Sequence, residues 1–256
     1  MKILPPKHDL VEFLGEHDFF MWEYYGKGIL GKIQAWIFRS RIKVLMKLMS
    51  QLRLQPSLVM DAGCGPMFIS YALTRNSKSE YIGVDIMPVD RLKKYRDAMR
   101  NAGVGSIEVI RASIEALPFR CETFDFLLSL DVLEHLNKPR KAVVEIRRVV
   151  KKNGVIAVSL PLENWFQRLS RIGFILMRIA GNSILQKAKR IPITKTPEYH
   201  YVGDIKSYNE MVNLLKKTFN FTFTKYTPIG IHRAININAL HIMFKKNKLQ
   251  SGKHNE

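Results

Sequence analysis

Between residues 57 and 160, short apolar runs alternate with segments of helical period, and this alternation constrains the fold more than any other feature of the chain. The apolar runs fall at 57–60, 80–84, 107–111, 124–130 and 154–160. Helical spacing fills intervals such as Asp90 to Asn101 and Lys138 to Lys151. The alternation predicts βαβ units, and therefore an α/β domain whose parallel sheet has helices on both faces.

The alternation of strand-like and helix-like segments ends after VIAVSLP at 155–161. A long segment, roughly 162–205, precedes another helix-like stretch at 206–217. Two strand-like runs follow, FNFTFTKY and ALHIMFKK, and no helix-length segment separates them, so they can pair antiparallel. We therefore expect a seven-stranded, mostly parallel sheet whose last strand is antiparallel.

Three further segments flank or interrupt this domain, which we place at residues 56–246. Residues 1–55 have helical spacing with a basic outer face from Lys32 to Leu52, and predict an N-terminal helical cap. The 162–205 segment is expected to be an insertion that covers the active-site edge together with this cap. Residues 247–256 form a polar tail.

A glycine turn follows the first apolar run, in VMDAGCGPMFIS at 59–70. Glycines after a strand let backbone N–H groups approach a ligand closely. A dinucleotide site requires a small residue where this chain has Phe68, and the Gly-Lys-Ser/Thr of a phosphate-binding loop is absent. Asp61, an anion at the mouth of the turn, would also repel a pyrophosphate. The turn therefore predicts a ligand with a cationic or zwitterionic end and no phosphates.

The second strand ends in YIGVDI, which places Asp85 twenty residues beyond Gly65. A carboxylate at the tip of this strand can accept hydrogen bonds from both hydroxyls of a ribose. A nucleoside with a cationic group and no phosphate describes S-adenosylmethionine.

These residues resemble motifs of the class I, Rossmann-like S-adenosylmethionine-dependent methyltransferases. DAGCG and YIGVDI look like the first two motifs, and three further stretches continue the resemblance: ASIEALPF at 112–119, FDFLLSLDVLEHL at 124–136 and VVKKNGVIAVSLP at 149–161. The spacing is similar to the type 11 subgroup, which contains the ubiquinone and menaquinone methyltransferases. The resemblance covers residues 50 to 161 and implies a Rossmann-like fold and an S-adenosylmethionine cofactor.

The resemblance also implies which residues bind the cofactor. Asp61 and the Gly63–Gly65 backbone would hold the methionine end, and Asp85 the ribose. Ser113 and its neighbour would flank the adenine, although the family usually has Asp where this chain has Ser113. The full expected set is Asp61, Ala62, Gly63, Cys64, Gly65, Asp85, Ile86, Ser113, Ile114 and Leu130.

Methyl transfer needs a base only if the acceptor must lose a proton. The LDVLEHL segment puts Asp131 and His135 at the carboxyl edge of the sheet, where α/β domains bind ligands. We expect Asp131 to contact the acceptor and His135 to act as the base, the alternative being a histidine that only packs or caps. Three residues of PEYHYVG could line an acceptor pocket or form a buried aromatic turn: Tyr199, His200 and Tyr201.

The net positive charge of the chain indicates which partners it could attract. Forty-one Lys and Arg against 22 Asp and Glu give a net charge of +19, which predicts attraction to polyanions. At residues 163–182, the stretch ENWFQRLSRIGFILMRIAGN has an apolar stripe and a basic face, and further basic residues follow up to residue 190. This pattern suits either a lid over the substrate or contact with an anionic membrane surface. RNA is less favoured, since aromatic stacking platforms and recognisable RNA modules are missing from the sequence.

The cysteine content and the lengths of the apolar runs bear on metal binding, disulfides and location. Cys64 and Cys121 are the only cysteines, and no cluster has metal-ligand spacing, so we expect neither zinc nor disulfides. No apolar run is long enough to span a bilayer, and MKILPPKHDL is unlike a signal peptide. We expect a cytoplasmic methyltransferase, peripheral at the membrane if residues 164–190 bind there. Its acceptor is a small molecule or a lipid- or quinone-like molecule; the alternatives are an RNA methyltransferase and a non-catalytic protein that binds the cofactor.

Overall fold

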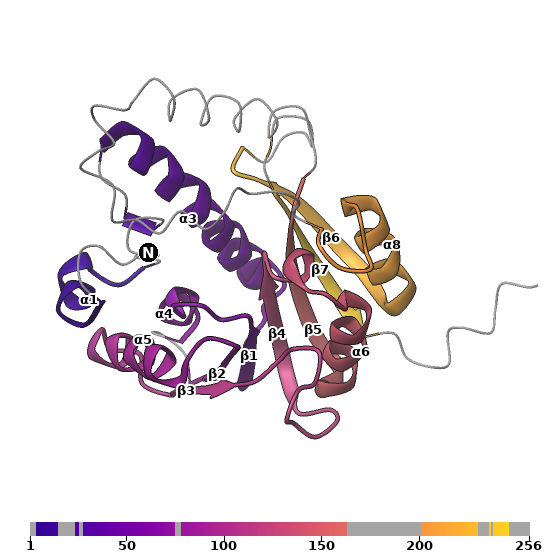
Figure 1. The fold of residues 1–256 in the computed structure, drawn as a ribbon, viewed down its shortest axis with the longest axis horizontal. Helices are drawn as coiled ribbons and strands as arrows, with labels where there is room; N and C mark the ends of the chain where they lie inside the picture. The colour runs from indigo at the N-terminus through magenta and orange to yellow at the C-terminus, as the bar shows by residue number, and fades with distance from the viewer. Residues whose placement is uncertain are drawn as a thin grey trace, which may run out of the picture.

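The computed structural model describes residues 4–14, 24–25, 28–74, 78–162, 201–229, 236 and 238–245. Their strands form one seven-stranded sheet in the order β3-β2-β1-β4-β5-β7-β6 (Figure 1). The strands are β1 Leu58–Ala62, β2 Glu80–Asp85, β3 Ile107–Arg111, β4 Phe124–Leu130, β5 Val150–Pro161, β6 Phe219–Thr227 and β7 Asn238–Lys245. The first five pair in parallel, and β7 runs antiparallel to both β5 and β6. The predicted mostly parallel sheet with its last strand antiparallel is confirmed.

Helices cover both faces of this sheet, as the alternation predicted. They are α1 Lys7–Leu14, α3 Gly28–Gln51, α4 Phe68–Thr74, α5 Val89–Asn101, the 3-10 turn η1 Leu133–His135, α6 Pro139–Val149 and α8 Tyr208–Thr218. Figure 1 shows α1, α4 and α5 on one side of the sheet and α6 and α8 on the other. Two apolar clusters separate the layers. One contains Leu10, Leu45 and Phe68, and the other contains Val143 and Leu215.

One helix boundary differs from the sequence prediction. Helical spacing predicted a helix from Lys138 to Lys151, just before Gly154, whereas α6 ends at Val149. Val150 already pairs with Phe124 of β4, so strand pairing takes over before the glycine. The register between β4 and β5 then shifts, and the intervening polar residues lie in that irregularity.

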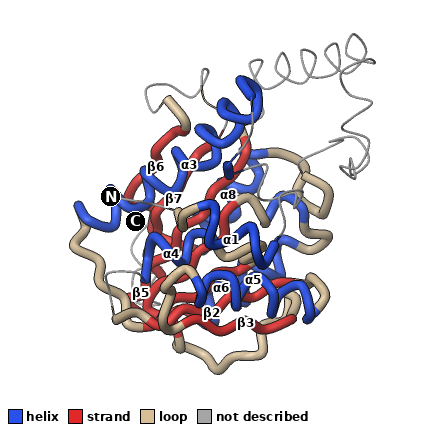
Figure 2. Tube along the Cα trace, turned by 90° about the vertical axis from the view of Figure 1, so that its left-hand side faces the viewer, coloured by secondary structure: helices blue, strands red, loops and turns tan. Residues whose placement is uncertain are grey.

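The N-terminal segment packs against the domain through α1 and α3. Helix α1 contacts α5, whereas α3 contacts α4 and β6. Figure 2 shows α3 alongside the end of the sheet that contains β6 and β7. Residues along α3, including Ile42, Leu45 and Leu48, are buried in the first apolar cluster. Among the described helices, none combines the length and the apolar character that a membrane span requires.

Candidate active site

The glycine turn after β1 adopts a conformation that glycine favours. Gly63 has φ +84° and Gly65 φ +49°. The N–H groups of Gly63 and Cys64 donate to the carbonyl oxygen of Val84 at 2.8 and 3.1 Å, which fastens the turn to the end of β2. A Cβ on Gly63 would lie 2.4 Å from Cγ2 of Val132, so the residue also has no room for a side chain. The turn and the loop after β4 are therefore packed directly against each other.

Asp85, at the end of β2, is held by backbone N–H groups on both of its carboxylate oxygens. Gly65 donates to Oδ2 and Met87 donates to Oδ1, each at 3.0 Å. Each oxygen keeps a second acceptor site. The carboxylate is only partly buried, so a ligand hydroxyl can reach it. The structure thus brings the glycine turn and the predicted ribose-binding acid together and orients the acid.

Asp61 lies beneath the same turn and is buried. Its carboxylate accepts a hydrogen bond from the hydroxyl of Tyr81. Burial, opposed by the Tyr81 hydrogen bond and assisted by the nearby charge of Asp85, raises the pKa of Asp61 to about 7. Tyr81 was missed by the sequence reasoning, because a tyrosine within a strand carries no motif. Its position next to Asp61 on the neighbouring strand follows only from the register of β1 and β2.

The remaining predicted cofactor residues lie along the same edge. The N–H of Ala112 donates to the carbonyl oxygen of Asp85 at 3.0 Å, which brings Ser113 close to that strand end. Ser113 is exposed and its Oγ accepts from the N–H of Glu115 at 3.2 Å, whereas Ile114 is buried in the core. Their role beside an adenine stays a prediction.

Three further members of the predicted set differ in exposure. Ile86 is 70% exposed, Leu130 is partly buried at the end of β4, and Cys64 is buried. Burial raises the pKa of the Cys64 thiol well above its usual value, so the thiol stays protonated. Ala62, the last residue of β1, is buried in the second apolar cluster.

Asp131 is the centre of a polar cluster formed by four elements. It has φ +56°, and its carboxylate accepts from Ser159 Oγ at 2.5 Å and from Asn238 Nδ2 at 2.9 Å to each oxygen. Arg41 of α3 forms an ion pair with the same carboxylate. Sequence reasoning placed Asp131 at this edge but missed these three partners, which come from distant parts of the chain. Contact of Asp131 with an acceptor stays a prediction.

Glu134 and His135 follow in η1. Glu134 is 2% exposed, and its Oε2 has no hydrogen-bond partner among the described residues. Burial raises the pKa of Glu134 to about 8, against the opposing effects of a backbone hydrogen bond and of Arg41. The side chain of His135 is 57% exposed, and partial burial lowers its pKa from the ordinary value. A neutral imidazole at neutral pH is compatible with the predicted role of a base, which remains to be tested.

The segment after the insertion reaches this edge, as the topology suggested. The N–H of Val202 donates to the carbonyl oxygen of Glu134 at 3.1 Å, and that of Asp204 to Asn137 at 3.2 Å. Tyr201 is buried and its hydroxyl donates to the carbonyl oxygen of Pro161 at 3.1 Å. This burial is compatible with the aromatic turn that was the alternative to lining a pocket, and contact of Tyr201 with an acceptor stays a prediction. Tyr199, His200 and the basic stretch 164–190 lie outside the described residues.

Within the described ranges, no group of three His, Cys, Asp or Glu side chains is arranged to hold a metal ion. Asp131, Glu134 and His135 are close in sequence, but the carboxylate of Asp131 is taken up by Arg41 and Asn238.

The comparisons with known proteins agree with this geometry. Residues 60–158 match the family described as "Methyltransferase domain". This segment is a methyltransferase domain. An uncharacterized protein of Methanocaldococcus jannaschii is 37% identical over 101 residues, which cover 40% of this chain and 39% of that protein. The ubiquinone/menaquinone biosynthesis C-methyltransferase UbiE of Marinomonas sp. is 32% identical over 97 residues, or 38% of each chain. The chain thus spans about two fifths of the length of these curated relatives.

Solved structures extend the similarity beyond the methyltransferase domain segment. The magnesium protoporphyrin IX methyltransferase of Synechocystis, solved with bound S-adenosylhomocysteine, is 16% identical to this chain, with a TM-score of 0.58. The alignment covers 94% of this chain and 100% of that one. At this identity the similarity establishes the fold. The prediction of a Rossmann-like, class I methyltransferase domain is confirmed, whereas membership of the ubiquinone and menaquinone subgroup stays a prediction.

Proposed function

We propose that the protein is an S-adenosylmethionine-dependent methyltransferase that acts on a small-molecule or lipid- or quinone-like acceptor. The observation that carries this proposal is the Asp85 carboxylate, which the glycine turn itself orients through Gly65. Together with buried Asp61, it makes the ligand-binding edge acidic. An acidic edge favours a cationic nucleoside and disfavours a nucleotide phosphate.

The residues present fit this cofactor. Asp85 offers free acceptor sites on two oriented oxygens to a ribose, and Asp61 offers a carboxylate to the ammonium group of the methionine portion. Backbone N–H groups of the turn are largely consumed by Val84 and Asp85, so the turn shapes the site more than it donates to the ligand. When bound, the cofactor supplies a methyl group activated by the sulfonium. The task of the chain is to bind and align.

On the acceptor side, we propose His135 as the base for an acceptor that must lose a proton. The support is its position after β4 and its lowered pKa, which keeps the imidazole neutral and able to accept. Asp131, Tyr199, His200 and Tyr201 are the proposed acceptor contacts. A relative named for ubiquinone and menaquinone biosynthesis and a neighbour named for magnesium protoporphyrin IX support a small organic acceptor.

The proposal includes a cytoplasmic location at a membrane surface. Its support is the amphipathic, basic sequence at 164–190 together with the net charge of +19. The alternative role of residues 164–190 is a lid over the acceptor.

Cofactor binding is tested first, by isothermal titration with S-adenosylmethionine. We expect binding by the unmodified chain and none by Asp85→Ala. The matched control is Glu80→Ala, which removes an exposed carboxylate at the opposite end of the same strand. Equal affinity of all three proteins would reject the site.

The acceptor class is tested with S-adenosylmethionine that carries a radiolabelled methyl group. The protein is incubated with host extract separated into lipid, RNA, protein and small-molecule pools, with Asp85→Ala as the blank. Label in the lipid or small-molecule pool supports the proposal. Label in RNA would reject a small-molecule or lipid acceptor and identify the protein as an RNA methyltransferase. This is the second candidate function, and the net charge of +19 favours it. Cofactor binding without label in any pool would reject catalysis.

A further inference from the structure

The outer face of α3 has a composition unlike that of an ordinary solvated helix. Lys32, Lys43 and Lys47 are exposed, and Ile33 and Trp36 are each 49% exposed among them. Positions 32, 36, 43 and 47 lie within one narrow stripe of a helix with 3.6 residues per turn. The face therefore combines cations with large apolar side chains along much of the helix.

These lysines are not balanced by carboxylates. Helix α3 contains no Asp or Glu, and in the ranges that the structure describes Lys32, Lys43 and Lys47 form no ion pair. The arginines of the helix are used elsewhere. Arg39 donates to the carbonyl oxygen of Tyr24 at 2.7 Å, and Arg41 pairs with Asp131. Three lysine charges thus remain on one face without a counter-charge.

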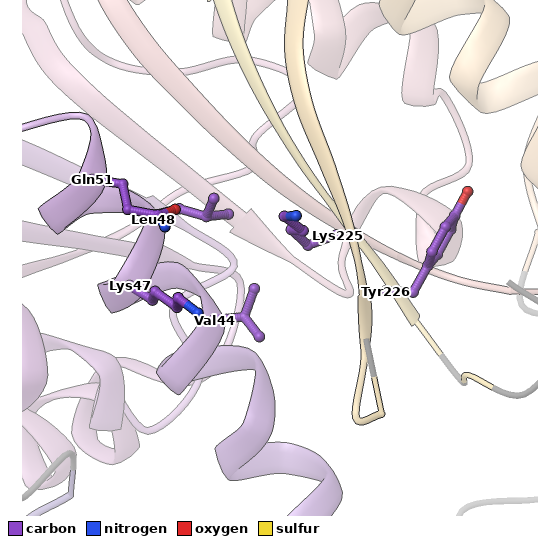
Figure 3. Close-up of a pocket in the computed structure, with 6 residues that line it drawn as sticks. All are labelled: Val44, Lys47, Leu48, Gln51, Lys225 and Tyr226. Carbon is purple, nitrogen blue, oxygen red and sulfur yellow. The ribbon is translucent and has the colours of Figure 1, made fainter. Parts of the chain in front are cut away.

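The surface continues across a hollow of about 230 Å³ between α3 and β6 (Figure 3). Figure 3 shows Val44 and Leu48 pointing from the helix toward the strand, with Lys47 on the helix side and Lys225 on the strand side. Lys225 is exposed and forms no ion pair with any described residue. Two like charges beside one hollow repel each other, and an anion placed between them relieves that repulsion.

We propose that this face docks on an anionic bilayer, with a phospholipid phosphate held between Lys47 and Lys225. An exposed indole among lysines is the arrangement of interfacial helices, since the ring enters the headgroup region while cations attract anionic lipid. Each lysine close to such a surface contributes to binding, and the contributions add. Trp36 and Ile33 supply the apolar contact, and Val44 and Leu48 supply an apolar floor beneath the phosphate.

The opposite side of the same helix connects the surface to the candidate active site. Arg41 reaches Asp131 after β4, so a bilayer on the outer face of α3 would lie one helix away from that edge. The residues of this surface are separate in sequence from the stretch at 164–190. The inference deepens the proposed membrane location by assigning it to a second surface, and because docking requires neither cofactor nor acceptor it can fail independently of methyl transfer.

The test is flotation of the full chain with vesicles of phosphatidylcholine, with and without phosphatidylglycerol, at low and high salt. We expect binding only to the anionic vesicles, and release by salt. The combined variant Lys32→Gln, Lys43→Gln and Lys47→Gln should weaken partition at least about tenfold. The control variant Lys93→Gln, Lys94→Gln and Lys141→Gln removes the same charge from exposed positions on α5 and α6 and should float nearly as the unmodified chain.

Tryptophan fluorescence gives a second readout, because the chain has three tryptophans. With Trp22→Phe and Trp165→Phe as background, brominated acyl chains should quench Trp36 in anionic vesicles. Equal loss of flotation in the two lysine variants, or an unquenched Trp36 on bound vesicles, would overturn the proposal. Binding of single-stranded RNA without any flotation would also overturn it and assign the surface to nucleic acid.

Discussion

Arg41 of α3 forms an ion pair with Asp131, the residue that follows β4, and this pair joins the N-terminal helix to the candidate active site. The guanidinium is almost fully buried and lies 4.3 Å from the centre of the Phe38 ring. Asp131 also has two partners in the sheet, Ser159 and Asn238. The N-terminal helix is therefore attached to the carboxyl edge by a specific charge, in addition to its apolar packing.

We expect Arg41→Ala to lower the free energy of unfolding by roughly 3 kcal/mol, because it leaves the carboxylate of Asp131 without its cation in a mostly buried position. Urea denaturation measures the change. Lys43→Ala, an exposed lysine on the same helix, should stay within about 0.5 kcal/mol of the unmodified chain. In the double variant with Asp131→Asn the two losses should not add. Strict additivity would show that the pair makes no energetic contribution.

Gly203→Ala should destabilise the contact between the segment after the insertion and the loop after β4. A Cβ there would lie 2.2 Å from the carbonyl oxygen of Leu136, and backbone cannot rotate away as a side chain can. We expect a loss of about 1 to 3 kcal/mol in thermal or urea unfolding. Gly105→Ala is the matched control, since its Cβ would meet nothing within 4 Å. Equal stability of both variants would contradict the observed packing.

Cofactor affinity should rise with pH through neutrality because of Asp61. Its pKa is raised to about 7, so the carboxylate that is proposed to bind the ammonium group is protonated below that value and charged above it. Titration calorimetry should show up to about a tenfold gain per pH unit below the pKa, levelling off above it. Tyr81→Phe removes a hydrogen bond that favours the charged form and should move the midpoint upward. Asp61→Asn should bind weakly at every pH, without this dependence.

Glu134 should make the fold less stable as pH rises. Its pKa is raised from 4.5 to about 8, so between these values the unfolded chain has lost the proton that the folded chain retains. The folded state binds more protons in this window, and its stability therefore falls from about pH 4.5 to about pH 8. Glu134→Gln removes the titrating group. The melting temperature of this variant relative to the unmodified chain should increase across the window, by several degrees at its upper end.

A constant difference in melting temperature between the two proteins from about pH 5 to about pH 8 would show that the Glu134 carboxyl ionises normally in the folded state. Asp61 titrates in both proteins, so its contribution cancels in the comparison.

The sheet and the glycine turn could be predicted because their determinants are local. Apolar runs, helical spacing and the Gly63–Gly65 turn can each be read from residues that lie close together in the sequence. Asp85 was placed correctly at the tip of β2, because the end of an apolar run is visible in the sequence. Helix α6 was extended too far because pairing of Val150 with Phe124 outweighs the helical spacing of its residues.

The partners of the site residues could not be predicted in the same way. Tyr81 reaches Asp61 only through the register of two strands, and Arg41 and Asn238 meet at Asp131 from opposite ends of the chain. Nothing in their local sequence distinguishes them from other tyrosine, arginine or asparagine residues. Contacts of this kind depend on the assembled fold.

The position of β7 determines when the candidate site can be completed during synthesis of the chain. This strand lies between β5 and β6, and because it runs antiparallel its first residue, Asn238, arrives at the edge that holds Asp131. A ribosome produces the glycine turn, Asp85 and Asp131 long before it produces Asn238. The proposed cofactor-binding residues are therefore made early, whereas the polar cluster around Asp131 is completed only when β7 enters the sheet. The proposed methyl transfer should accordingly appear only late in synthesis.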